Sequence, residues 1–400
     1  MTRRAALSAT LGLAVAVPRL ARAQTDTLQR HRLATASGRG FTLNLLPGFG
    51  VRIVAEGMRR ARFFAASPDR RIFVTDLHSL FDTRQGSVHV LDGFDPGKGE
   101  KVRAVPFATG LRNPNSVAFH TDVEGRHWFY MALTDRLVRY RYEPGDTAPS
   151  GAPATLATFP DHGLDYRYGG WHLTRTIAFG PDGTLYVSAG SSCNACVEEE
   201  EVRATVTRMN ADGSEARIIA RGLRNAVGLK WIGDRLVATN MGADHLGNDR
   251  PDDTMFALEP GRDYGWPHCY HDKAEVRPDP KFPRPDGCRD VPRPMAVFPA
   301  HSSPLGFAFF AGTGILKHSD PRLQDVYLVA LQGSFKQTLR RGYKVVRIDG
   351  GGRQSDFITG FLSADGTVHG RPCDILPVGP DRFLLSDDKA GLVYYVFPVR

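Results

Sequence analysis

The stretch LYVSAG, residues 185 to 190, decides the fold because close relatives of its first five residues recur along the chain. Each is a short run rich in strand-forming residues that ends on small or polar ones. The runs start 56, 57, 50, 91 and 57 residues apart, and a sustained period of this kind is the signature of a repeat architecture. They are IFVTD from Ile72, WFYMA from Trp128, LYVSA from Leu185, RLVAT from Arg235, VYLVA from Val326 and FLLSD from Phe383.

A second series of strand-like runs follows the first in step. With one further strand before each Pro-Asp-type turn and a weakly marked outer strand, each unit holds about four strands. Six such units predict an all-β, six-bladed β-propeller with antiparallel blades, whereas a two-domain sandwich predicts no sustained period. The second series is SVHVL from Ser87, RLVRY from Arg136, TVTRM from Thr205, TMFAL from Thr254, YKVVRI from Tyr343 and LVYYV from Leu392.

Domain boundaries follow from this period. We expect residues 40–400 to form one propeller, and the long gap between units four and five predicts an inserted loop region at about 263–299. Residues 1–23 have the composition of a signal peptide: Arg3-Arg4, an apolar run, then Ala21-Arg22-Ala23. The arginines around the apolar run favour the twin-arginine route, and the segment predicts a periplasmic or secreted protein.

The charge balance excludes some partners. The chain carries a formal charge of +8, and removal of the four signal-peptide arginines leaves 8 − 4 = +4. No Lys/Arg run interleaved with aromatic residues supports binding to nucleic acid, and no apolar stretch approaches the roughly 20 residues of a membrane span.

All five cysteines lie in the exported part. Cys193 and Cys196 form a C-x-x-C pair, and Cys269 and Cys288 bracket a Pro-rich loop. A redox motif, haem attachment and a zinc site each lack the residues they need around SSCNAC. Export therefore favours two structural disulfides with Cys373 left reduced.

Polar side chains recur where the first strand of each unit is expected to begin. In a propeller these strands line the central channel, so their starts converge on one mouth. Arginine, asparagine and histidine there form a donor-rich, positive pocket suited to a planar polyanion, although salt bridges between blades are an alternative reading. These residues are Arg62, Asn113, Asn115, His172, Arg175, Arg224, Asn225, His301, Arg371 and Asp374.

Two further features of the sequence bear on this predicted pocket. The tetrapeptide GLRN occurs at Gly110–Asn113 and again at Gly222–Asn225. Unit four adds TNMGADHLGNDRPDD, residues 239–253, whose acids and glycines suit a hard cation such as calcium, or equally a solvated acidic loop.

Five segments together resemble the soluble glucose/sorbosone (aldose sugar) dehydrogenases that use pyrroloquinoline quinone. The similarity runs from about Gly57 to the C-terminus. The segments are RNAVGLKW, ATNMGADHLGNDRPDD, LEPGRDYGWPHCY, AHSSPLGFAFF and GRPCDILPVGPDRFLLSDDKAGLVY.

The resemblance implies a role for each matched position. His172 matches the catalytic base, and Arg224 with Asn225 matches the pair near the quinone oxygens. Gly242 and Ala243 match the two residues whose carbonyls hold the cofactor calcium. Arg62, His301, Lys336 and Arg371 fall at further cofactor contacts.

The sequence also departs from the family pattern. Ala243 replaces a proline, Ser191 stands where some members orient the histidine with a carboxylate, and Asn240 replaces a glutamate. The segment Gly333–Gln337 lacks an aromatic-Asn-Arg pattern common in close relatives.

The implied reaction is oxidation of an aldose or related sugar aldehyde or hemiacetal to the lactone or acid. His172 would act as base, and an external quinone or cytochrome would take the electrons. Two alternatives remain open at this stage. One is a calcium-dependent lactonase-type hydrolase, and the other is a binding propeller in which His172 is a packing residue.

Overall fold

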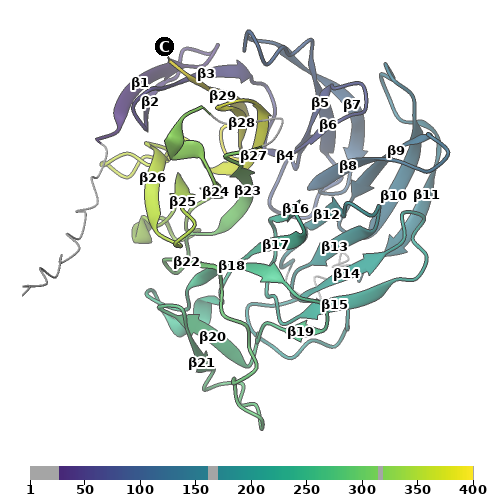
Figure 1. Cartoon of the computed structure of the whole chain (residues 1–400), viewed down its shortest axis with the longest axis vertical. Helices are drawn as coiled ribbons and strands as arrows, with labels where there is room; N and C mark the ends of the chain where they lie inside the picture. The colour runs from purple at the N-terminus through teal and green to yellow at the C-terminus, as the bar shows by residue number, and fades with distance from the viewer. Residues whose placement is uncertain (1–26, 161–169, 314–318, 400) are drawn as a thin grey trace, which may run out of the picture.

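The computed structural model describes residues 27–160, 170–313 and 319–399. Its strands form six four-stranded antiparallel blades around a central axis (Figure 1). The prediction of an all-β, six-bladed propeller is confirmed. The expected signal peptide, residues 1–23, and the last residue of the expected domain, Arg400, lie outside the described residues.

The blades follow one another along the chain, each running from an inner to an outer strand. Blade one consists of β4 (Ala61–Ala66), β5 (Ile72–Asp76), β6 (Gly86–Asp92) and β7 (Arg103–Leu111). Blade two consists of β8 (Ser116–Thr121), β9 (His127–Ala132), β10 (Arg136–Tyr142) and β11 (Ser150–Thr158). Blade three consists of β12 (Arg175–Phe179), β13 (Leu185–Ala189), β14 (Thr205–Met209) and β15 (Arg217–Arg221).

The second half repeats this order. Blade four consists of β16 (Leu229–Ile232), β17 (Arg235–Asn240), β18 (Asp253–Leu258) and β22 (Ala296–Phe298). Blade five consists of β23 (Pro304–Phe310), β24 (Val326–Leu331), β25 (Lys344–Ile348) and β26 (Gln354–Thr359). Blade six consists of β27 (Pro372–Gly379), β28 (Arg382–Asp387), β29 (Leu392–Pro398) and β3 (Phe49–Ala55). The two repeated sequence series are the second and third strands of the blades.

The two ends of the chain close the ring. The outer strand of blade six, β3, comes from the N-terminal part and pairs antiparallel with β29, with Val51 opposite Val396. Before it, β1 (Gln29–Ala34) and β2 (Gly40–Leu45) extend the outer edge of blade five through β26. The folded part therefore begins upstream of residue 40, the expected boundary.

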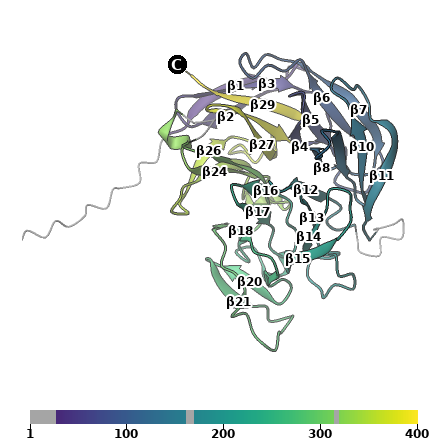
Figure 2. The same ribbon diagram turned by 45° about the vertical axis from the view of Figure 1, so that its right-hand side comes forward.

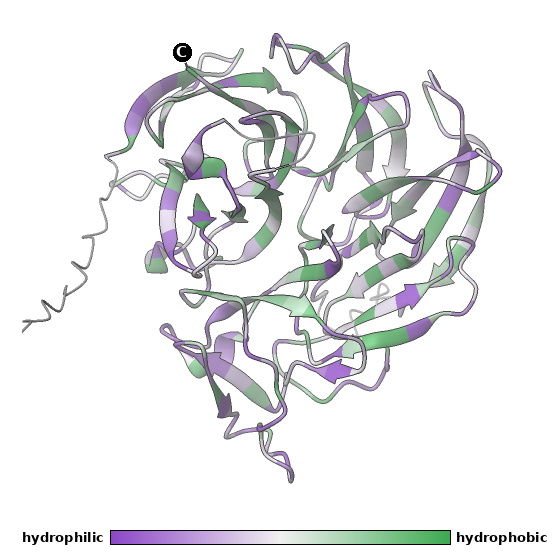
Figure 3. Ribbon diagram, in the orientation of Figure 1, coloured by the Kyte–Doolittle hydropathy of each residue, from purple (hydrophilic) through white to green (hydrophobic). Residues whose placement is uncertain are grey.

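The core is divided among the interfaces between blades. Six large clusters of buried apolar side chains each join two neighbouring blades, including the first and the sixth. Because strand side chains alternate between faces, Phe129 packs toward blade one while Tyr130 packs toward blade three. Figure 3 shows the resulting green apolar residues along the blades. Packing on both faces holds the six inner strands in a contiguous ring.

The segment between β18 and β22 leaves the ring. It holds β19 (Arg262–Asp263), which pairs parallel with β15, and a hairpin of β20 (Cys269–Asp272) and β21 (Glu275–Pro278). Figures 1 and 2 both place this hairpin outside the blades. The insertion expected at 263–299 thus contains the hairpin, but its last part, β22, is the outer strand of blade four.

Regular helix is confined, among the described residues, to three short 3₁₀ turns: η1 (Asp244–Leu246), η2 (Pro321–Leu323) and η3 (Gln337–Leu339). None of the described helices is long and apolar enough to cross a membrane.

Candidate active site

Several inner strands are preceded by residues in the left-handed backbone region. Asn113, His172, His301 and Ser303 have φ angles of 42°, 46°, 66° and 53°. Residues other than glycine rarely adopt this backbone conformation. Where they do, the residue often belongs to a functional site. His172 and His301, both predicted site residues, are among them.

His172 is anchored through one ring nitrogen. Its Nδ1 lies 2.9 Å from both the carbonyl oxygen and the hydroxyl oxygen of Ser191. The Ser191 hydroxyl donates its own proton to the carbonyl oxygen of Cys193 at 2.7 Å, so both Ser191 oxygens can only accept from the ring. We conclude that Nδ1 carries the hydrogen and Nε2 carries the basic lone pair.

The electrostatic surroundings keep this imidazole neutral. Burial, and after it the positive charge of Arg224, hold the pKa of His172 well below its usual value, and the hydrogen bond to Ser191 opposes them only in part. A neutral imidazole with a free Nε2 is the form that can accept a proton at neutral pH.

Arg224 is held by an uncharged partner. Its Nε donates to the carbonyl oxygen of Asn194 at 2.8 Å, and its Nη2 donates to the Asn194 Oδ1 at 2.9 Å. The side chain is only 4% exposed, and the nearest carboxylate oxygen, of Asp244, is 3.6 Å away. The guanidinium also lies over the Trp171 ring, 5.7 Å from its centroid. Burial lowers the pKa of Arg224, while Asp244 and Asp253 oppose that effect.

Asn225 and His172 meet across Gly190, at the end of β13. A Cβ atom at Gly190 would lie 2.5 Å from the Asn225 Oδ1 and 2.7 Å from the His172 Cβ. Only glycine therefore fits between the two side chains. The Asn225 backbone N–H donates to the Oδ1 of Asn240 at 3.0 Å, so Asn240, one of the departures from the family pattern, supports this corner.

The loop after β17 places the predicted calcium residues next to this group. The Gly242 N–H donates to the Asp253 Oδ1 at 2.8 Å, and Ala243 precedes η1 directly. Burial raises the pKa of Asp253 to about 7. The carbonyl oxygen of Gly242 accepts no hydrogen bond from any residue that the structure describes.

His301 differs from His172 in its protonation. Its Nε2 donates to the Gly247 carbonyl at 2.8 Å, and its Nδ1 lies 3.0 Å from the Asp244 Oδ1. The hydrogen bond to Asp244 raises the pKa of His301, which favours the imidazolium form. Through Asp244, His301 joins the same network as Arg224.

Arg62 and Arg371 form a second group on blades one and six. Arg62 donates to the Asn115 Oδ1 at 2.9 Å and pairs with the buried Asp388 at 2.7 Å. Arg371 donates to the Gln332 carbonyl at 3.2 Å, and the Gln332 amide in turn donates to Asp388. Arg62 lies within β4 rather than before it, because Ala61 already pairs with Asp76.

The structure thus sorts the predicted residues into groups. His172, Arg224, Asn225, Gly242, Ala243 and His301 are joined through short contacts on blades three to five. Arg62 and Arg371 share the Asp388 network. Lys336 is exposed before η3, and its ammonium group contacts no described hydrogen-bonding or acidic partner.

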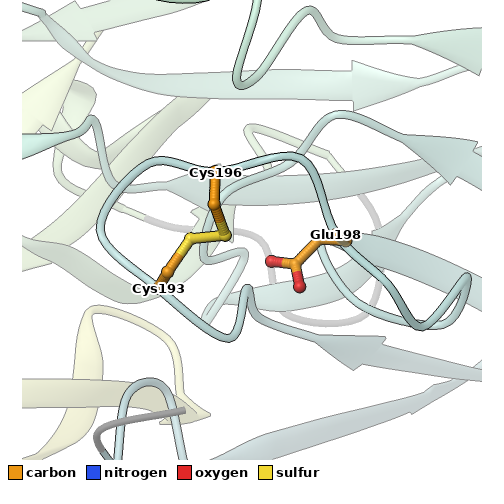
Figure 4. Close-up of side chains that lie close together, drawn as sticks. All are labelled: Cys193, Cys196 and Glu198. Carbon is orange, nitrogen blue, oxygen red and sulfur yellow. A yellow bond between two sulfur atoms is a disulfide. The ribbon is translucent and has the colours of Figure 1, made fainter.

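The cysteines pair as predicted. The disulfides are Cys193–Cys196 and Cys269–Cys288, and Cys373 is free and buried. Within the described ranges, one group of three His, Cys, Asp or Glu could in principle surround an ion, namely Cys193, Cys196 and Glu198 (Figure 4). Both of its sulfur atoms are in the disulfide bond, so no thiolate is available there to a metal.

Sequence reasoning missed three members of these networks: Asn194, Gln332 and Asp388. Ser191 and the two cysteines of SSCNAC are named from the sequence, but no role is given to Asn194, which lies between the cysteines. FLLSD is assigned to a strand and lies in a segment that carries the resemblance, but no role is given to the next residue, Asp388, whose carboxylate pairs with Arg62.

Comparison with known proteins identifies the family. The model of the TrAA12-like family matches residues 43–359. The chain belongs to this family. A curated relative of this TrAA12-like protein, an uncharacterized protein of Borreliella burgdorferi, is 26% identical over 222 residues, which are 53% of this chain and 57% of the relative. The chain thus covers little more than half of that relative's length.

Solved structures similar to this TrAA12-like protein include three with named activities or families. The holo pyranose dehydrogenase PQQ domain of Coprinopsis cinerea has a TM-score of 0.70 and 18% identity, covering 89% of this chain and 97% of that one. The calcium structure of a Trichoderma reesei family AA12 enzyme has a TM-score of 0.68 and 15% identity, covering 95% and 99%. The PQQ-bound aldose sugar dehydrogenase of Streptomyces coelicolor has a TM-score of 0.61 and 21% identity, covering 88% and 99%. At these identities the likeness establishes a shared fold, and the family resemblance found in the sequence is confirmed.

Proposed function

We propose that this protein is a quinoprotein dehydrogenase that oxidises an aldose, or a related sugar aldehyde or hemiacetal, to the lactone or acid. Pyrroloquinoline quinone and calcium are the proposed cofactors. The observation that carries the proposal is the pairing of a neutral His172, with Nε2 free, and a buried Arg224 whose two hydrogen-bond acceptors are uncharged.

The side chains fit a planar polyanionic quinone. Arg224 has a buried guanidinium with no carboxylate in hydrogen-bond contact, which suits a developing negative charge on an oxygen. Trp171 offers an aromatic face beside it, and Asn225 adds an amide. Arg62 and Arg371 would contact carboxylates from the other group of blades, and His301 and Lys336 are the remaining proposed contacts.

The loop after β17 fits a hard cation. Gly242 and Ala243 would offer their carbonyl oxygens, and the Gly242 carbonyl has no protein donor among the described residues. Close packing fixes this backbone, because a Cβ at Gly242 would lie 2.6 Å from Pro251. The change from proline to Ala243 matters little in this arrangement, since only a carbonyl is used.

The chain's own contribution to the reaction is proton transfer and placement. When bound, the quinone supplies the acceptor for the hydride that leaves the sugar's anomeric carbon. His172 Nε2 takes the proton of the anomeric hydroxyl as that hydride leaves, so a C=O bond forms and a cyclic sugar becomes a lactone. Arg224 stabilises the negative charge that develops. An external quinone or cytochrome would serve as the final electron acceptor.

A periplasmic or secreted location completes the proposal. The export signal expected at residues 1–23 supports it, and so do two disulfides, which persist in oxidising compartments.

Neither alternative has comparable support. A calcium-dependent lactonase needs several side-chain carboxylates and asparagines around one metal. Among the His, Cys, Asp and Glu side chains of the described ranges, the one candidate group is the disulfide-bonded one of Figure 4. The alternative of a binding propeller, in which His172 is a packing residue, does not explain why the His172 backbone is left-handed or why its Nε2 is left available as a base.

The proposal is tested by adding pyrroloquinoline quinone and calcium to purified protein and following dye reduction with a panel of aldoses. We expect quinone-dependent dye reduction with at least one sugar. Quinone binding without oxidation of any sugar would support a binding role, and lactone hydrolysis without quinone would support the hydrolase.

A further inference from the structure

The motif GLRN places two arginines in equivalent positions, and the structure gives them different partners. Arg112 precedes the inner strand of blade two, and Arg224 precedes that of blade four. Each donates to a residue 30 positions earlier, in the loop between the second and third strands of the preceding blade. That residue is Asp82 for Arg112 and Asn194 for Arg224.

The charges differ accordingly. Arg112 Nε donates to the Asp82 carboxylate at 2.8 Å, and Asp135 lies 3.7 Å from its Nη1. Arg224 also has an acid at the longer distance, the half-exposed Asp244 at 3.6 Å, but it has no carboxylate within hydrogen-bond distance. Arg224 has the same kind of two-point contact to Asn194, but with carbonyl oxygens that carry no net charge. Both side chains are nearly fully buried, at 6% and 4% exposed.

Asn194 also connects the two halves of the site. Its Oδ1 accepts a second hydrogen bond, at 2.8 Å, from the N–H of Asp244, in the loop proposed to hold calcium. Asn194 itself lies in the loop after β13, between Cys193 and Cys196, which form a disulfide. The first residue of this loop, Ser191, binds the His172 ring and donates its N–H to the Arg224 carbonyl at 2.8 Å.

We propose that Asn194 is a positioning residue that fixes the Arg224 guanidinium without cancelling its charge, and that the disulfide-closed loop Ser191–Cys196 holds base, arginine and metal loop in register. The proposal rests on the proposed function and assigns that site a residue to which sequence reasoning gives no role. An aspartate at position 194 would reproduce the Arg112–Asp82 ion pair. The carboxylate would then neutralise the Arg224 guanidinium, with no charge left for an anionic ligand.

Asn194→Asp converts the site to the blade-one arrangement with almost no change in size. We expect it to weaken quinone binding, followed by absorbance titration, by at least about tenfold. We also expect the pKa of His172, followed by ring-proton NMR in cofactor-free protein and assigned with His172→Ala, to rise. The charged groups that act on His172 are Arg224, Arg203 and Arg175, and compensation of Arg224 removes the largest of these three contributions.

Two controls separate charge from general disturbance. Asn210→Asp adds the same charge on a surface turn of blade three, where the Asn210 amide donates to Ser214 at 2.9 Å. Asp82→Asn makes the reverse exchange beside Arg112 and should change neither quinone affinity nor the His172 titration. Asn194→Ser, which removes the amide without adding charge, should lower turnover and leave the His172 pKa low, and it serves if Asn194→Asp does not fold.

The outcomes distinguish this proposal from the proposed function. Equal quinone affinity and equal His172 titration in Asn194→Asp and Asn210→Asp would overturn the role of Asn194 while leaving the dehydrogenase intact. If the wild-type protein binds no quinone, the function fails, and the His172 titration still decides whether Asn194 controls the charge of Arg224.

Discussion

Ser191 and Arg224 are joined by a backbone hydrogen bond of 2.8 Å, from the Ser191 N–H to the Arg224 carbonyl. The other polar atoms of Ser191 hold the His172 ring. The proposed base and the proposed electrostatic group therefore share one support. Both Ser191 atoms that contact the ring are neutral oxygens, so this support adds no negative charge that would raise the pKa of His172.

His172→Ala is expected to leave quinone binding nearly unchanged and to slow sugar oxidation by at least ~10²-fold, the usual scale for the loss of an acid–base group. The reductive half-reaction rate and the melting temperature should be measured on one preparation. His120→Ala is the matched control, because His120 stacks on Phe179 at 4.6 Å outside the site and should affect stability alone. A low-melting His172→Ala protein with an unchanged rate would show that His172 is a packing residue.

Arg224→Ala and Arg112→Ala should have opposite consequences. Loss of Arg224 should weaken quinone binding and slow turnover together, because it removes the charge that faces the cofactor. Loss of Arg112 removes the cation that hydrogen-bonds the nearly buried Asp82, whereas Asp135 keeps Arg136, and the fold should be destabilised by about 3–5 kcal/mol. Quinone titration and denaturant unfolding of both variants provide the comparison, and a quinone defect in Arg112→Ala would count against the assignment.

Removal of divalent ions should abolish quinone binding, and calcium should restore it. The blades are held by apolar clusters between them, so circular dichroism should show the fold surviving in chelator. An absorbance titration in chelator that gives the same quinone affinity as in calcium would reject Gly242 and Ala243 as calcium ligands.

The pH dependence follows from the lowered pKa of His172. As pH falls, the imidazole stays neutral until the pH reaches that lowered value, so the acid limb of kcat/KM should lie below 6.5, the ordinary value. Stability has the corresponding sign: below pH 6.5 the unfolded chain binds a proton at His172 that the folded protein does not, and stability decreases. His172→Ala should lose less stability over this range, and an acid limb above pH 7 would contradict the assignment.

The two disulfides should differ in function. Cys193→Ser/Cys196→Ser frees the loop that holds His172 and Arg224, and we expect lower turnover and weaker quinone binding. Cys269→Ser/Cys288→Ser, the control, opens the insertion and should lower the melting temperature with little effect on rate per folded molecule. Peptide mass mapping without reductant checks the native pairing, and equal kinetic effects in the two double variants would contradict a special role for the first loop.

The sequence by itself determined the architecture, because a propeller blade is a local unit. Strands such as β5 and β13 correspond to runs of five strand-forming residues. The regular recurrence of such runs along the chain gives the number of blades. The cysteine pairs were also within reach, since each pair lies close together in the sequence. The roles of His172 and Arg224 stay predictions that rest on the family resemblance. The closing strand β3 was not within reach, because its pairing with β29 joins opposite ends of the chain.

Only the tertiary structure decided the electrostatics. GLRN is the same four letters at both sites, yet one arginine meets Asp82 and the other meets Asn194, each 30 residues away. The tautomer of His172 likewise depends on the hydrogen bond that the Ser191 hydroxyl donates to the Cys193 carbonyl oxygen. The apolar pattern can be read from the sequence because every strand repeats it. The residue that hydrogen-bonds a buried arginine is instead a single distant partner, which only folding brings within 3 Å.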